Sequence, residues 1–115
     1  MSERGDAEFL GDIKEAAARI EIYIEGMNYE QFLEDIKTQD AVVRNLEIIG
    51  EAAKNISDDV KERHPQIVWK KLAGVRDRLV HHYFGVNYDI VWVIVKKELP
   101  EVILQIEMLW SGEKI

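Results

Sequence analysis

The stretch D-A-V-V-R-N-L-E-I-I-G-E-A-A-K-N-I, residues 40–56, decides the fold class of this chain. Its apolar residues recur at spacings of four, three, four and three, at Val42, Leu46, Ile49, Ala53 and Ile56. This spacing lines one face of a helix and is typical of a helix that packs nearly parallel to its neighbours. Thr38 is predicted to cap the helix, and Asp40 suits the positive end of its dipole. The stretch therefore predicts a long helix inside a helical bundle.

Two further helices are predicted before this stretch. The first runs from about residue 6 to Gly26, because its apolar residues are spaced by three and four positions. The second runs from about residue 29 to 36, because Asn28 and Gln31 have the spacing of a capping box. Three apolar side chains of this second helix are expected to turn inward, those of Phe32, Leu33 and Ile36.

Two helical segments are predicted after it. A short helical turn over residues 58–63 should stop before Pro65, because the residue before a proline avoids the helical region. A longer helix is then predicted from residue 69 or 70 to residue 83 or 84. Gly85 is expected to be its C-terminal stop.

The last segment, residues 88–110, is predicted to be a long amphipathic helix that Pro100 kinks near Lys97. No strand pattern, internal repeat or low-complexity tract competes with these helices. The expected fold is therefore all-α, an up-and-down bundle of four main helices plus short helical turns. With 115 residues the chain is expected to form a single domain, residues 1–115. Three aromatic residues are expected in the core or at a dimer interface, Trp69, Trp92 and Trp110.

The composition limits the classes of function. The net charge of −7 argues against nonspecific binding of a polyanion over the whole surface. The chain has no cysteine, which excludes disulfides and zinc-thiolate sites. It shows neither a secretory signal nor a membrane span, so the expected location is the cytoplasm. Residues 69–83 nevertheless hold four basic residues against one acidic residue, which predicts a local basic site on an acidic body.

The stretch R-D-R-L-V-H-H-Y, residues 76–83, holds the candidates for chemistry, Arg76, His81 and Tyr83. On a regular helix Arg76 and Tyr83 lie within roughly 20° of each other, whereas His81 lies about 140° from Arg76. Long side chains, a distorted helix end or a second chain is needed to bring all three together, and a symmetric dimer would supply the second chain. The alternative is a solvated helix terminus with Tyr83 at the rim of the core.

The pattern R-x-x-x-x-H-x-Y followed by F-G-V-N-Y-D-I-V-W resembles the HepT-like branch of the HEPN superfamily. The resemblance spans roughly residues 8–107 and includes G-M-N-Y-E-Q-F-L at 26–33, the stretch at 40–56, and I-V-W-K-K-L-A-G-V-R-D at 67–77. It implies a HEPN-like helical homodimer and a metal-independent endoribonuclease with two motifs lining one cleft. It also implies a toxin-antitoxin pair with a minimal nucleotidyltransferase as the antitoxin.

The resemblance and the residue types together suggest roles. Arg76 and His81 are the expected catalytic residues, since RNA carries its own 2′-hydroxyl nucleophile and needs only acid-base help and charge stabilisation. Asp77 and Tyr83 are expected to support them. The family's partner enzyme can transfer AMP to the tyrosine of the motif, so Tyr83 is the predicted adenylylation site. The alternative is that Tyr83 orients His81 or stacks on a base.

Further basic residues are expected to hold the RNA backbone, namely Arg78, Lys70, Lys71, His82 and Arg44. A polar stripe formed by Arg44, Glu47, Glu51 and Lys54 is expected to hold helix-stabilising ion pairs, unless Arg44 or Glu51 supports the motif. No metal site and no cofactor are predicted. His81 and His82 point about 100° apart on a helix, and no nearby pattern such as H-E-x-x-H supplies further ligands.

Two positions depart from the family's pattern. Asp77 stands where the family commonly has asparagine, and Asn87 stands where it commonly has aspartate. An ionised aspartate cannot donate a hydrogen bond and would repel a phosphate, which lowers the expected rate. Two other functions therefore stay open. One is a noncatalytic nucleotide-binding or regulatory subunit of a nucleotidyltransferase complex, and the other is a purely structural dimerisation bundle.

Overall fold

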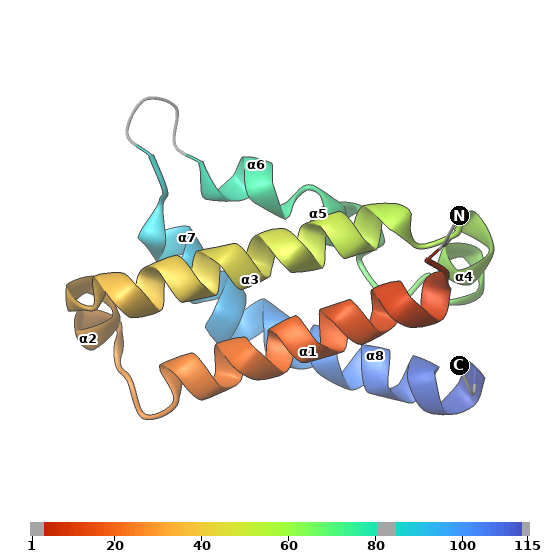
Figure 1. Ribbon diagram of the computed structural model, residues 1–115, viewed down its shortest axis with the longest axis horizontal. Coiled ribbons are helices and arrows are strands. Elements are labelled where there is room, and N and C mark those ends of the chain that lie inside the picture. The colour runs from red at the N-terminus through yellow and green to blue at the C-terminus, as the bar shows by residue number, and fades with distance from the viewer. Residues whose placement is uncertain (1–3, 81–84, 114–115) are drawn as a thin grey trace.

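Two long antiparallel helices form the centre of the fold, α1 (Asp6–Ile24) and α3 (Ile36–Asn55). The computed structural model describes residues 4–80 and 85–113. In Figure 1, α5 (Trp69–Ala73) and α6 (Val75–Leu79) follow one side of α3, and α8 (Leu99–Glu113) packs against α1. The predicted all-α bundle is confirmed. No helix in the described ranges is both long and apolar enough to cross a membrane.

The predicted apolar stripe of α3 forms the middle of the core. Its five residues expose at most 3% of their surface, Val42, Leu46, Ile49, Ala53 and Ile56. α1 meets this stripe with a matching set of buried residues at helical spacing, Leu10, Ile13, Ala17, Ile20 and Ile24. Burial of apolar surface along this contact stabilises the pair of helices by about 25 cal/mol for each Å² removed from water.

The start of α3 differs from the prediction. The capping box of α2 (Tyr29–Glu34) is confirmed, because the Gln31 amide donates to Asn28 Oδ1 at 2.8 Å. Asp35 then caps α3 by accepting the Thr38 amide at 2.9 Å, so the prediction that Thr38 is the cap was wrong. α3 begins at Ile36 and not near residue 40, because a carboxylate follows directly after α2.

Two burial predictions for residues 29–36 were wrong. Phe32 is fully buried, but Leu33 is 44% exposed and Ile36 is 71% exposed. The sequence predicts that both turn inward on one helix over residues 29–36. α2 ends at Glu34, however, and the new helix begins at Ile36 with its side chain in solvent. Gln39 closes the junction by donating to the Phe32 and Leu33 carbonyls, each at 2.9 Å.

The segment that carries the R-x-x-x-x-H-x-Y pattern is not the single long helix that was predicted. α4 (Asp58–Arg63) has the predicted bounds, but the next helix breaks at Gly74 into α5 and α6. α6 ends at Leu79, after which Val80 is extended and pairs with Val86 in an isolated antiparallel bridge. Gly74 and the β-branched Val75 and Val80 are poor helix formers, which favours the break and the early end.

Gly85 was predicted to end this helix, and that prediction was wrong. It has a positive φ of 81°, a conformation that favours glycine, and it directly precedes Val86 of the bridge. The Asn87 amide also donates to the Leu79 carbonyl at 2.7 Å. The chain therefore enters and leaves residues 81–84 at neighbouring positions.

The last helix is interrupted, as Pro100 predicts. α7 (Tyr88–Val93) passes into a π-helical turn η2 (Ile94–Glu98) and then into α8. Pro100 has no amide hydrogen to donate to a carbonyl of the preceding turn. The predicted kink near Lys97 falls inside η2.

The three tryptophans pack as expected of core aromatics. Trp69 is 6% exposed, and its Nε1 donates to the His64 carbonyl at 3.0 Å. Trp92 packs against Phe32 with ring centroids 5.1 Å apart, which joins α7 to α2. Trp110 is partly buried against the core beside the Lys14 ammonium.

Candidate functional site

A close approach of two backbones places α5 and α6 on α3. Gly50 is buried at this contact, and a Cβ atom there would lie 2.8 Å from Val75 Cγ1 and 3.2 Å from the Leu72 carbonyl. Only a residue without a side chain allows this spacing. Arg76 follows Val75 directly, so this contact sets the position of Arg76 beside the polar side of α3.

Arg76 shares a hollow with the polar stripe of α3. The hollow has a volume of about 340 Å³ and is lined by Arg44, Glu47, Gly50, Glu51, Lys54, Ala73 and Arg76. Lys54, Ala73 and Arg76 also line an adjoining hollow of about 450 Å³, together with Gly74 and Asp77. The structure therefore brings Arg76, Asp77 and Arg44 to one region of the surface.

Arg76 is exposed and, within residues 4–80 and 85–113, forms no ion pair. Glu47 and Glu51 line the same hollow, but within the described residues the only ion pair of the stripe joins Lys54 to Glu51, at 4.0 Å. The stripe was predicted to hold several helix-stabilising ion pairs, and the described chain has one, the long Lys54–Glu51 contact. The Arg76 guanidinium keeps its donors available to an anionic ligand.

Arg78 lies in a different environment. Its guanidinium donates to both carboxylate oxygens of Glu98, at 2.9 and 2.8 Å, and Lys71 Nζ lies 3.5 Å from the same carboxylate. The hydrogen bond from Arg78 lowers the pKa of Glu98, and the hydrogen bond to Glu98 raises the pKa of Arg78. This ion cluster joins α6 to η2. A role of Arg78 and Lys71 in holding RNA stays a prediction.

Residues 81–84 lie outside the described residues, and with them the predicted roles of His81, His82 and Tyr83. On either side of this segment, Val80 and Val86 pair in the isolated antiparallel bridge. The angle calculated between Arg76 and His81 assumed a regular helix through both, and α6 ends at Leu79. The angle expected for a regular helix therefore does not apply to Arg76 and His81.

The sequence did not point to Glu98 or Gly50. Glu98 is 20 residues from Arg78, and no local pattern links them. Gly50 sits within a helical pattern, where an isolated glycine is a signal of close packing that could have been read. In the described part of the chain no group of three or more histidine or carboxylate side chains could hold a metal ion.

Comparison with known proteins gives the family. The sequence profile described as Ribonuclease HepT-like matches residues 13–109. A Thermococcus cleftensis protein named as a probable ribonuclease HepT is 48% identical over 99 residues, covering 86% of this chain and 90% of that protein. The candidate RNase MJ0127 of Methanocaldococcus jannaschii is also 48% identical over 99 residues, covering 86% of this chain and 82% of that protein.

A second Methanocaldococcus jannaschii protein, the candidate RNase MJ1216, is 44% identical over 109 residues, covering 95% of this chain and 90% of that protein. No solved structure matches the chain significantly. The profile match covers nearly the whole bundle, from α1 to the last turns of α8. On this match and these identities, the chain belongs to the HepT-like ribonuclease family.

Proposed function

We propose that this chain is a metal-independent endoribonuclease with Arg76 and His81 as its catalytic residues. The observation that carries the proposal is the contrast between two arginines of α6. Arg78 is held by Glu98, whereas Arg76 is exposed and forms no ion pair with any described residue. An exposed guanidinium can bind a phosphodiester through two parallel N–H groups. A member of a ribonuclease family needs such a phosphodiester contact to bind its substrate.

The proposed reaction uses the 2′-hydroxyl of RNA as the nucleophile. His81 takes the hydroxyl proton while the 2′-oxygen bonds to phosphorus and the bond to the 5′-oxygen breaks. The leaving 5′-oxygen receives a proton from water, so the products carry a 2′,3′-cyclic phosphate and a 5′-hydroxyl. Arg76 stabilises the added charge on the phosphorane. Acid-base help of this kind typically contributes about a hundred- to ten-thousand-fold in rate.

The active form in this proposal is a homodimer. A symmetric pair places two copies of the motif at one interface, where they can line one cleft. Exposed apolar side chains beside the motif support such an interface. Val80 is 50% exposed directly before residues 81–84, and Val93 is 44% exposed on α7, which packs against α6.

Tyr83 is the proposed control point. A minimal nucleotidyltransferase would join the phenol oxygen to the α-phosphate of ATP and release pyrophosphate. The AMP group adds bulk and negative charge beside the catalytic residues, which excludes RNA. Co-expression of the two proteins should then raise the mass of the wild-type chain by one AMP unit and leave Tyr83→Phe unmodified. An unmodified wild-type chain beside an active nucleotidyltransferase contradicts this part of the proposal.

The direct test is cleavage of total RNA in EDTA by the wild type and by His81→Ala and Arg76→Ala. Arg19→Ala is the matched control, because Arg19 is an exposed arginine on α1 whose ion pair with Glu15 is also exposed. Cleavage by the wild type and the control alone, with 2′,3′-cyclic phosphate ends, supports the proposal. RNA left intact by folded, unmodified wild type overturns it.

A second candidate function is a noncatalytic subunit that binds nucleotide or docks a nucleotidyltransferase. The mixed charge around Arg76 favours it, since Glu47, Glu51 and Asp77 line the same two hollows. Asp77→Asn discriminates the two functions. A nuclease should cleave RNA about fivefold faster after this change, because one unit charge about 4 Å from a phosphate in water costs about 1 kcal/mol. A binding subunit gains nucleotide affinity and no cleavage.

A further inference from the structure

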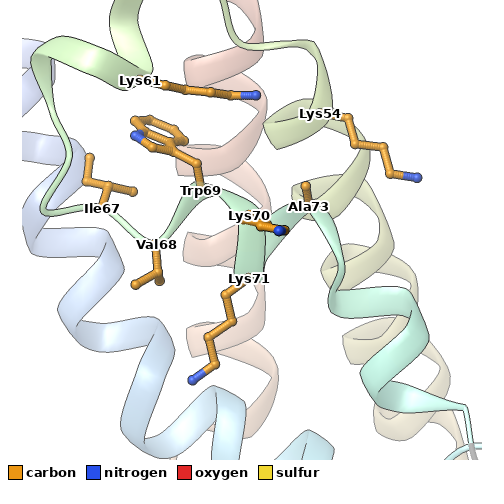
Figure 2. Close-up of a pocket in the computed structure, with 8 residues that line it drawn as sticks. All are labelled: Lys54, Lys61, Ile67, Val68, Trp69, Lys70, Lys71 and Ala73. Atoms are coloured by element: carbon orange, nitrogen blue, oxygen red, sulfur yellow. The ribbon is translucent and has the colours of Figure 1, made fainter. Parts of the chain in front are cut away.

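A second groove lies beside the Arg76 hollows, on the outer side of α5. It has a volume of about 830 Å³ and a largely apolar floor formed by Ile67, Val68, Trp69 and Ala73. Four lysines complete its lining, Lys54, Lys61, Lys70 and Lys71, and none of the described residues that line it is acidic. Figure 2 shows Lys61 extending past the Trp69 ring and the lysines spread around the floor.

The charge of this groove is unusual for a chain of net charge −7. Lys71 and Lys54 have carboxylate partners, Glu98 at 3.5 Å and Glu51 at 4.0 Å. Lys61 and Lys70 form no ion pair in the part of the chain that the structure describes. Two ammonium groups with no carboxylate partner in the described chain thus border an apolar floor.

The floor of the groove combines a fixed, buried side chain with an exposed one. Trp69 is 6% exposed and is fixed by its hydrogen bond to the His64 carbonyl. Val68, by contrast, leaves 47% of its surface in solvent between buried neighbours. A flat, partly apolar group can therefore rest on Val68 without rearrangement of the core.

The groove is continuous with the proposed catalytic surface. Lys54 and Ala73 line this groove and also both hollows that contain Arg76. A single extended ligand can therefore cross Arg76, pass Lys54 and enter the groove. A strand that carries anionic and flat groups in turn can contact both the cations and the apolar side chains along this path.

We propose that the groove of α5 binds the nucleotides that flank the cleaved bond in single-stranded RNA. A base lies on Val68 while the neighbouring phosphates contact Lys61 and Lys70. The inference rests on the proposed ribonuclease function and adds to it a second contact region outside the catalytic motif. It makes the enzyme depend on substrate length, because a dinucleotide reaches Arg76 but not the groove.

The test measures binding separately from cleavage. A 2′-O-methyl RNA of roughly 12 nucleotides has no free 2′-hydroxyl and is bound without being cut. Its affinity is measured against salt concentration for the wild-type chain and for Lys61→Gln/Lys70→Gln. The control is Lys37→Gln/Lys97→Gln, which removes the same charge from two exposed lysines that do not line the groove.

The expected result is a weaker salt dependence of RNA binding in the groove variant alone. The slope of log affinity against log salt should fall by about 0.7 for each lysine removed, and the control should keep the wild-type slope. Val68→Glu should weaken binding as well. On cleavable RNA, the ratio of kcat/KM for the long substrate to that for a dinucleotide should fall in both groove variants.

Other results overturn the inference. If wild type cleaves RNA and the groove variants match the control, the ribonuclease function stands and the groove is not part of it. If wild type binds RNA without cleaving it, the proposed ribonuclease function is wrong. The salt slopes then still show whether the groove binds RNA. Equal competition by an oligoglutamate peptide, or a changed oligomeric state in the groove variants, assigns the groove to an acidic protein segment or to a second copy.

Discussion

At the scale of single residues, two arginines that differ by two positions have different surroundings. Residues two apart on a helix point about 160° from each other, so Arg76 and Arg78 face opposite sides of α6. Arg78 meets Glu98 of η2 through two hydrogen bonds, and Arg76 faces the polar side of α3. Only one of the two guanidinium groups is therefore available to a ligand.

Replacing each arginine by glutamine should separate stability from activity. Arg78→Gln removes a bidentate, partly buried ion pair and should lower the free energy of unfolding by about 1 kcal/mol. Arg76→Gln should leave the unfolding free energy unchanged and abolish RNA cleavage. Urea denaturation followed by circular dichroism measures the first effect, and a cleavage assay measures the second. Equal stability of the two variants would contradict the structural role of Arg78.

The Arg78–Glu98 contact should also be visible in the pH dependence of stability. Arg78 lowers the pKa of Glu98 in the folded chain, so this stabilisation is complete above the ordinary glutamate pKa of about 4.3. It is lost as the pH falls through the lowered pKa. Glu98→Gln should therefore be less stable than wild type at pH 7, and the difference should vanish in stronger acid. A constant difference in urea titrations from neutral to acidic pH would refute the ion pair.

At the scale of secondary-structure elements, one glycine determines how closely α5 and α6 approach α3. Gly50 leaves no room for a Cβ atom beside Val75 and the Leu72 carbonyl. The π turn η2 acts at the other side of α6, since it carries Glu98 toward Arg78. α6 is thus held between α3 and η2 through contacts on opposite faces.

Gly50→Ala should destabilise the fold and weaken RNA cleavage together. The added methyl group overpacks the contact and should cost about 1–3 kcal/mol, because Val75 and backbone atoms must move. Gly11→Ala is the matched control in α1, where the added Cβ would meet Trp110 at an ordinary 3.9 Å. The control should be neutral or more stable by up to about 1 kcal/mol. Thermal denaturation of both variants decides the matter, and a stable, active Gly50→Ala would refute the close contact.

At the scale of the whole molecule, either one chain or two chains can form the proposed catalytic site. The net charge of −7 disfavours RNA contact over most of the surface. The proposed homodimer would bring two such regions together. Mixing of inactive variants tests whether Arg76 of one protomer works with His81 of its partner.

Arg76→Ala and His81→Ala are each inactive in the proposed mechanism. After they are unfolded together and refolded, a mixed dimer contains one site with both residues intact, provided that the two protomers share each site. Random pairing should then restore roughly a quarter of wild-type cleavage. Each variant refolded alone is the control. Mixed dimers with no activity would mean that each chain uses its own arginine and histidine, and monomers in light scattering would end the dimer proposal.

The sequence by itself determined the helical class, the apolar stripe of α3, the capping box at Asn28 and the interruption that Pro100 causes. Each depends on residues within a turn or two of one another, where periodicity, side-chain capping and a missing amide hydrogen act directly. The motif arginine and the family resemblance were readable for the same reason, since both are local patterns of residue types.

Only the tertiary structure decided where α6 ends, why Gly50 is needed and which arginine is available to a ligand. Arg78 and Glu98 are 20 residues apart, and Gly50 and Val75 lie on different helices. Such contacts depend on how whole helices pack, and packing is not encoded in the spacing of any one segment. Local pattern therefore predicted candidate residues, and the approach of α3, α6 and η2 assigned a structural partner to Arg78 while leaving Arg76 exposed.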